Sequence, residues 1–349
     1  CKMISLLTIF YICFPDSLGV ISSPNTDTMA LLLVLFILNE WSKLLAEREQ
    51  RMVPYSLLCI LAVFAISVKL STALLVLLTM KPAFILLKER NWKMVFTFVG
   101  LGILVIMPFL LRNIVISGYL VYPYASIDLF DVDWKMPSYM LDFDKREIMA
   151  WGKGLNDVNR SGETFMQWLP VWWSDQRVWM KFMVSLNLIL FPIGIVAIVH
   201  DIREQLWDKV LLIVTCVAIF LSWFFSAPLQ RYGMVFAFLF PISILGEHII
   251  NLKCQQLLKY GCYGLTAVIV VFAVVSVLKM PPVSLKRSAY YIWRECREKE
   301  WDGIQMYLPI ENGYMGYYFF PATQQEKVLE YIELRGQDIA DGFKVKDEY

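Results

Sequence analysis

The sequence contains few charged residues for its length. Of its 349 residues, 18% are charged and 58% are hydrophobic, and the mean hydropathy is +0.55. A soluble domain would carry about 25% charge. The composition therefore indicates an integral membrane protein. The net charge of +1 gives no sign of a nucleic-acid partner.

Residues that commonly serve metal and redox chemistry are scarce as well. The chain has two histidines, and no two of its seven cysteines form a CxxC pair. Neither a disulfide framework nor a zinc site is therefore predicted. No internal repeat and no glycine-rich phosphate loop is visible in the sequence. No metal site and no cofactor are assigned, and a divalent cation stays an open alternative.

The apolar residues are gathered in runs close to the length that crosses a bilayer as a helix. They predict a mainly α, polytopic helical membrane protein of about 8–9 spans. Because Lys69 interrupts one long apolar stretch, two shorter helices with a polar hinge are expected there. The predicted spans are Ile4–Val20, Thr28–Leu45, Pro54–Val68, Leu70–Leu87, Trp92–Leu111, Phe182–Val199, Val210–Phe225, Tyr232–Ile250 and Gly261–Leu278.

Basic residues in the short loops predict the sidedness, since cytoplasmic loops carry an excess of lysine and arginine. Four such loops are placed inside, and they contain Lys43, Arg48 and Arg51, then Lys88, Arg90 and Lys93, then Arg203 and Lys209, and finally Lys253 and Lys259. Alternation then places a long loop, 112–181, and the tail outside. The expected division is a transmembrane domain, 1–279, followed by a small extracytoplasmic α+β cap, 280–349. Cys1 in place of methionine suggests that the chain begins inside a longer protein.

Two sequence stretches outside the predicted spans receive more specific expectations. The stretch "FMQWLPVWWSDQRVWMKF" predicts an interfacial helix that enters the next span, with its tryptophans forming an aromatic belt. In the tail, "YYIWRECREKEWDG" predicts a helix and "GYMGYYFFPAT" a strand or turn.

Polar residues at the outer ends of spans are costly and are usually paired or functional. Three separate outer turns contain the cations Lys69, Arg112 and Arg231, which could together bind one anion, most simply a lipid phosphate. The predicted site has Asp27 as its catalytic residue. Its carrier-phosphate group is Lys69, Arg112, Asn113, Tyr122, Arg231 and Tyr232.

Each of these residues also has a purely structural interpretation. Asp27 lies in a run typical of helix N-caps. Lys69 could extend its ammonium group to the membrane interface. Arg112 could bind the last carbonyls of a helix that ends there. Tyr119, Tyr122 and Tyr124 are expected to line a pocket after Arg112.

Four short motifs together resemble the GT-C glycosyltransferase superfamily of bacterial membrane proteins. They are "SPNTDTMALLL", "VKLS", "LRNIVISGYLVYP" and "APLQRYG", and the tail is similar to an uncharacterised bacterial branch. The resemblance implies sugar transfer from a polyprenyl-phosphate carrier at the outer face of the bacterial inner membrane. The implied partners are a lipid-linked sugar donor and membrane lipid.

The general base cannot be carried over from this resemblance, because the superfamily's catalytic aspartate usually lies in the loop after the first span, and that loop is expected upstream of Cys1. The base is therefore expected upstream of Cys1 or among Asp27, Asp128, Asp131 and Asp133. Two other functions stay open, an O-antigen-type polymerase or ligase and a transporter or flippase. Transporters place charges near the middle of spans and often have repeated halves, neither of which is seen here.

Overall fold

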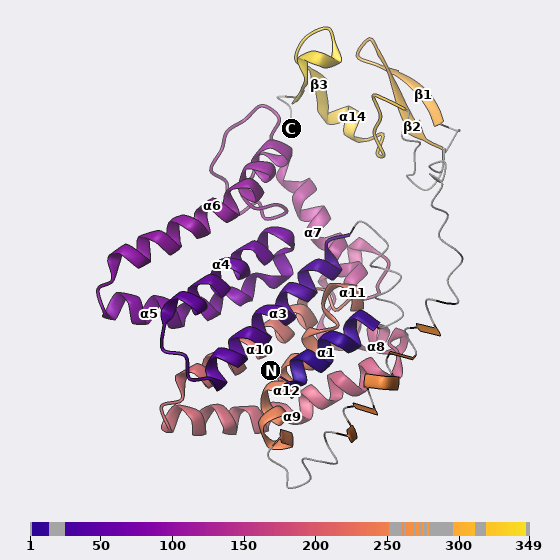
Figure 1. Ribbon diagram of the computed structural model, residues 1–349. Helices are drawn as coiled ribbons and strands as arrows, with labels where there is room; N and C mark the ends of the chain where they lie inside the picture. The colour runs from indigo at the N-terminus through magenta and orange to yellow at the C-terminus, as the bar shows by residue number, and fades with distance from the viewer. Residues whose placement is uncertain are drawn as a thin grey trace. The chain divides into compact units, whose positions relative to one another are not determined.

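In a computed structural model the protein is mostly helical (Figure 1). The structure describes residues 2–13, 25–250, 296–310 and 319–346, together with parts of 260–278. Two compact units share the chain. Unit 1 comprises Cys1–Phe109 and Arg146–Lys279, and unit 2 comprises Leu110–Lys145 and Met280–Tyr349. The first part of the predicted outer loop thus groups with the tail, whereas the expected division placed it in the transmembrane domain.

Unit 1 is a bundle of apolar helices. Its first half contains α1 (Lys2–Cys13), α3 (Asp27–Ala46), α4 (Met52–Val68), the 3₁₀ helix η1 (Leu70–Thr79), α5 (Met80–Lys88) and most of α6 (Trp92–Ser117). Its second half contains the end of α7 (Ser138–Gly152), η2 (Val158–Gly162), α8 (Phe165–Asp175), α9 (Val178–Arg203), α10 (Trp207–Ser226), α11 (Gln230–Gly233) and α12 (Phe236–Ile250). Helix α3 packs against α1 and α4, and α10 packs against η1, α9 and α12 (Figure 1).

Among the described residues, five helical segments are long and apolar enough to cross a membrane. They are Asp27–Ala46, Leu70–Lys88, Trp92–Ser117, Val178–Arg203 and Trp207–Ser226, and three shorter apolar helices accompany them. The hinge predicted at Lys69 is confirmed, because α4 ends at Val68 and η1 begins at Leu70. Part of the predicted span Gly261–Leu278 lies outside the described residues.

Helix α6 shows most directly why an apolar environment is required. Phe96 is 71% exposed and Leu104 is 62% exposed. A helix that exposes such side chains all round is stable in lipid and not in water. Its end, however, was predicted wrongly, because the helix continues through Arg112 to Ser117. Gly118 then ends it with a positive φ of 79°, and its amide donates to the carbonyl of Ile114 at 2.8 Å.

The core of unit 1 contains polar contacts that join helices. Trp41 and Tyr55 are fully buried and meet edge to face at 4.9 Å between ring centroids. Lys81 lies over the Tyr55 ring at 3.8 Å and donates to Asp208 at 2.8 Å. This ion pair joins the start of α5 to the start of α10.

Unit 2 contains the end of α6, the start of α7 and small β-structures of the tail. Strand β1 (Cys296–Trp301) pairs antiparallel with β2 (Ile304–Pro309), and β3 (Ile332–Leu334) with β4 (Phe343–Val345). The tail also contains α14 (Val328–Tyr331) and η3 (Ile339–Asp341), so an α+β composition is confirmed for its described residues. The helix predicted over 290–303 was wrong for 296–301. There β1 finds a partner in β2 across a turn at Asp302 and Gly303, both of which have positive φ.

Candidate functional site

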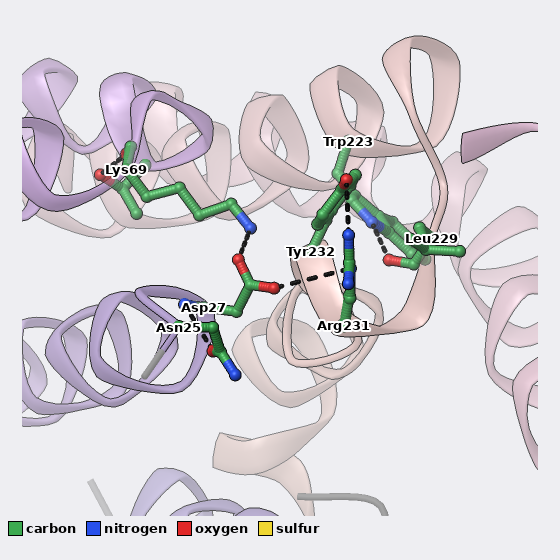
Figure 2. Close-up of polar contacts among 8 residues, drawn as sticks. Asn25, Asp27, Lys69, Trp223, Leu229, Arg231 and Tyr232 are labelled. Atoms are coloured by element: carbon green, nitrogen blue, oxygen red, sulfur yellow. Dashed lines mark hydrogen bonds and ion pairs between the residues drawn. The ribbon is translucent and has the colours of Figure 1, made fainter. Parts of the chain in front are cut away.

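Three charged residues of unit 1 that are far apart in sequence meet in one cluster (Figure 2). Asp27 is the first residue of α3, Lys69 links α4 to η1, and Arg231 is in α11. One carboxylate oxygen of Asp27 accepts a hydrogen bond from the Lys69 ammonium. The other carboxylate oxygen lies 3.7 Å from Nε of Arg231. A single carboxylate therefore binds two cations from two separate elements.

Tyr232 completes this cluster with its ring and its hydroxyl. The Lys69 ammonium lies 4.1 Å from the centroid of the Tyr232 ring. The Tyr232 hydroxyl accepts a hydrogen bond of 3.2 Å from the Arg231 guanidinium (Figure 2). An aromatic face attracts a cation electrostatically, so Tyr232 supports both positive charges. We call Asp27, Lys69, Arg231 and Tyr232 the ion cluster.

The ion cluster is buried on one side and accessible on the other. The side chains of Asp27 and Lys69 are 11% and 16% exposed, whereas that of Arg231 is 59% exposed. Burial lowers the pKa of the Lys69 ammonium, and the hydrogen bond to Asp27 opposes that shift. Two cations and one carboxylate leave one positive charge in excess. The cluster can therefore accept an anion, and Arg231 is the part that such an anion would reach first.

The backbone around Lys69 is fixed by local hydrogen bonds. Its amide donates to the carbonyl of Ala65 at 2.9 Å, and its carbonyl accepts from both the amide and the hydroxyl of Thr72. Thr72 itself is fully buried. The Ser-Thr sequence after Lys69 thus serves, through Thr72, to hold the hinge in an extended conformation.

Helix α3 is capped by Asn25 rather than by Asp27. The Asn25 side-chain oxygen accepts from the Asp27 amide at 3.0 Å. The Asp27 carboxylate is directed to the two cations instead (Figure 2). The structure thus gives the Asp27 carboxylate two charged partners in place of the helix-cap role that the sequence allowed.

The short turn before Arg231 is held by tryptophans. Trp172 of α8 donates to the carbonyl of Pro228 at 2.8 Å, and Trp223 of α10 donates to the carbonyl of Leu229 at 3.1 Å. Gln230 donates to Gln176 at 3.2 Å. This role of Trp172 was not predicted, because the tryptophans of residues 165–182 were interpreted as a membrane-interface belt. Trp168 and Trp172 are 2% and 1% exposed and belong to the core, so the belt interpretation was wrong for both.

Three further residues of the predicted site belong to unit 2 and make contacts within it. Arg112 is exposed on α6. Asn113 is buried, and its amide donates to the carbonyl of Leu120 at 3.3 Å, which ties the end of α6 to the turn that follows. The Tyr122 hydroxyl donates to the carboxylate of Asp144. Because Arg112 lies inside the helix, the interpretation of Arg112 as a cap for the end of α6 was wrong.

Two of the acidic residues considered as a general base, Asp128 and Asp133, have partners within unit 2. Asp128 binds Lys135. Arg335 donates to both carboxylate oxygens of Asp133, at 2.8 and 2.7 Å, and these bonds lower the pKa of Asp133. A carboxylate with a lowered pKa accepts a proton less readily, so Asp133 is poorly suited to act as a base. Asp131 is exposed. Among the described residues, no group of three or more His, Cys, Asp or Glu could hold a metal ion.

Residues 1–238 match the model of a protein family described as a domain of unknown function, DUF8201. The chain belongs to this family. The DUF8201 match includes all four residues of the ion cluster and ends before the β-strands of the tail. No curated protein and no solved structure matches the chain.

Proposed function

We propose that this protein is a membrane glycosyltransferase that transfers a sugar from a polyprenyl-phosphate carrier. In this proposal the ion cluster binds the carrier phosphate at the outer face of a bacterial inner membrane, where the loop and the tail also lie. The observation that carries the proposal is the buried Asp27 carboxylate bound to Lys69 and Arg231 in a largely apolar bundle. Such a cluster is costly in an apolar bundle and is usually functional.

The excess positive charge suits the chemistry of this reaction. As the bond between the sugar and the phosphate oxygen breaks, negative charge grows on the phosphate. Lys69 and Arg231 would stabilise that charge in a site of low polarity, where such interactions are strong. Asp27 would hold both cations in place and keep Lys69 protonated despite its burial. Arg112, Asn113 and Tyr122 stay in the proposal as further contacts of the carrier.

The acceptor hydroxyl must lose a proton as its oxygen bonds to the sugar carbon. A carboxylate would take that proton. Asp27 can accept this proton only after one of its carboxylate oxygens has lost its contact with a cation, because both oxygens face cations in this structure. A phosphate bound to Lys69 and Arg231 would provide that release by competing with Asp27 for the cations.

The test is binding of a polyprenyl phosphate to the purified full-length protein in lipid nanodiscs. Lys69→Met and Arg231→Gln each remove one of the two cations, so each variant should bind at least about tenfold more weakly, since a hydrogen bond to a charged group stabilises by about 1.5–3 kcal/mol. Arg203→Gln makes the same charge change at an exposed position in the last turn of α9 and should bind like the wild type.

Equal binding by the wild type, Lys69→Met and Arg231→Gln would overturn the proposed phosphate site. Weaker binding by Arg203→Gln as well would show only that polyprenyl phosphate binding depends on the overall surface charge. Arg112→Gln in the same series tests whether the carrier also contacts unit 2.

A further inference from the structure

Unit 2 contains a small cavity that the proposed phosphate site does not use. Its volume is about 160 Å³, and it is lined by Pro123, Tyr124, Ala125, Ser126, Asp142 and Lys145. An engineered protein cavity of about 150 Å³ binds benzene. The space thus suits one six-membered ring and not a longer chain of rings.

The lining combines one flat aromatic face with several hydrogen-bonding groups. Tyr124 offers a ring and a hydroxyl, and Ser126 offers a second hydroxyl. The Asp142 carboxylate accepts hydrogen bonds, whereas the Lys145 ammonium donates them. Convergence of a few polar groups around an apolar surface is the usual character of a small-molecule site.

The charges of this cavity differ from those of the ion cluster. Asp142 and Lys145 carry opposite charges, so the lining is neutral in sum. A phosphate would meet the Asp142 carboxylate and gain no excess of positive charge. A neutral ligand with several hydroxyl groups fits better, because its hydroxyls can donate to Asp142 and accept from Lys145.

Contacts within unit 2 hold the two walls of the cavity together. The Tyr122 hydroxyl donates to Asp144, which ties the turn to the start of α7. The Tyr124 amide donates to the carbonyl of Val121 at 2.8 Å. Lys145 lies 5.6 Å from the centroid of the Tyr124 ring. A cavity whose walls are already positioned binds a ligand with a smaller entropic cost.

We propose that this cavity binds one neutral sugar ring, which stacks on Tyr124 and donates hydroxyl hydrogen bonds to Asp142. The inference stands apart from the carrier-phosphate proposal, because neither Lys69 nor Arg231 lines the cavity.

The experiment is saturation-transfer NMR on the full-length protein in nanodiscs. The probes are the neutral methyl glycosides of glucose, galactose, mannose and N-acetylglucosamine, with glycerol as a hydroxyl-rich molecule that has no ring. A single ring of this size is expected to bind with a dissociation constant of about 1 mM. At least one glycoside should give a signal and glycerol should give none.

Asp142→Asn keeps the shape of the side chain but removes its charge, and Tyr124→Leu removes the aromatic face. Asp142→Asn should weaken glycoside binding about tenfold, because a hydrogen bond to a carboxylate is stronger than one to a neutral amide. Tyr124→Leu should weaken it several-fold, roughly the effect of losing an aromatic contact. The matched control is Asp175→Asn, the same change at an exposed position outside the cavity, and it should bind as the wild type does. Gel filtration of each variant checks that it is folded.

Three results would overturn this inference. They are absence of binding by every glycoside, equal binding by the wild type and both cavity variants, and displacement of the glycoside by inorganic phosphate at equal concentration. Because polyprenyl phosphate binding is measured separately on Lys69→Met and Arg231→Gln, failure of the sugar site is distinguishable from failure of the phosphate site.

Discussion

Replacing Asp27 with asparagine is expected to destabilise the protein by about 3–5 kcal/mol, the usual effect of removing one partner from a buried ion pair. The change leaves the Lys69 ammonium buried without its carboxylate. Burial already lowers the pKa of Lys69, and loss of Asp27 would lower it further. Part of the destabilisation is therefore the cost of releasing the lysine proton or of hydrating the buried charge.

The matched variant changes both partners at once. Asp27→Leu combined with Lys69→Met fills the same space with apolar groups and leaves no buried charge unpaired, apart from the more exposed Arg231. Buried pairs replaced in this way are often neutral or stabilising. We expect the double variant to unfold close to the wild-type midpoint while polyprenyl phosphate binding is lost.

Thermal and SDS-induced unfolding of the solubilised protein measure these differences. Glu49→Gln serves as the control, because it breaks a pair whose Arg51 side chain is 79% exposed and should change stability far less. Wild-type stability in Asp27→Asn would contradict a structural role for the Asp27–Lys69 pair. A double variant as unstable as Asp27→Asn would show that packing, and not charge, is responsible.

The sequence allowed the ion cluster to be predicted in part, because charge stands out in an apolar chain. Lys69 interrupts a hydrophobic stretch, and Arg231 lies in a short turn between two apolar runs. Asp27 was identified as well, although its spacing alone could not distinguish a helix cap from a carboxylate bound to cations. The side chain of Asn25 decides between them, and only coordinates reveal which side chain reaches the amide.

Other features could not be predicted, since they depend on contacts between distant residues. Nothing in the local pattern around Arg112 indicates that the helix continues to Ser117. At Gly118, which follows, an added Cβ atom would lie 2.9 Å from the Cα of Lys135. Strand β1 contains mostly charged residues that are common in helices. Pairing with β2 overrides that preference.

Trp172→Ala is expected to destabilise the protein by about 3–5 kcal/mol, the range for removing a buried tryptophan. Trp172 is 1% exposed and packs edge to face on Phe224 at 5.5 Å between ring centroids. An interfacial tryptophan of an aromatic belt would cost much less to remove. Trp173→Ala is the matched control, because the neighbouring tryptophan is only partly buried and should lose less stability.

Trp172→Phe separates packing from the hydrogen bond that positions the ion cluster. Phenylalanine retains an aromatic ring against Phe224 but cannot donate to the carbonyl of Pro228. The lost bond should reduce stability by about 0.5–1.5 kcal/mol beyond the change in packing. Because Pro228 lies three residues before Arg231, the turn should also hold its guanidinium less firmly. Polyprenyl phosphate binding should therefore weaken in Trp172→Phe while Trp173→Phe binds normally, and equal binding in both would show that Trp172 supports the fold without positioning Arg231.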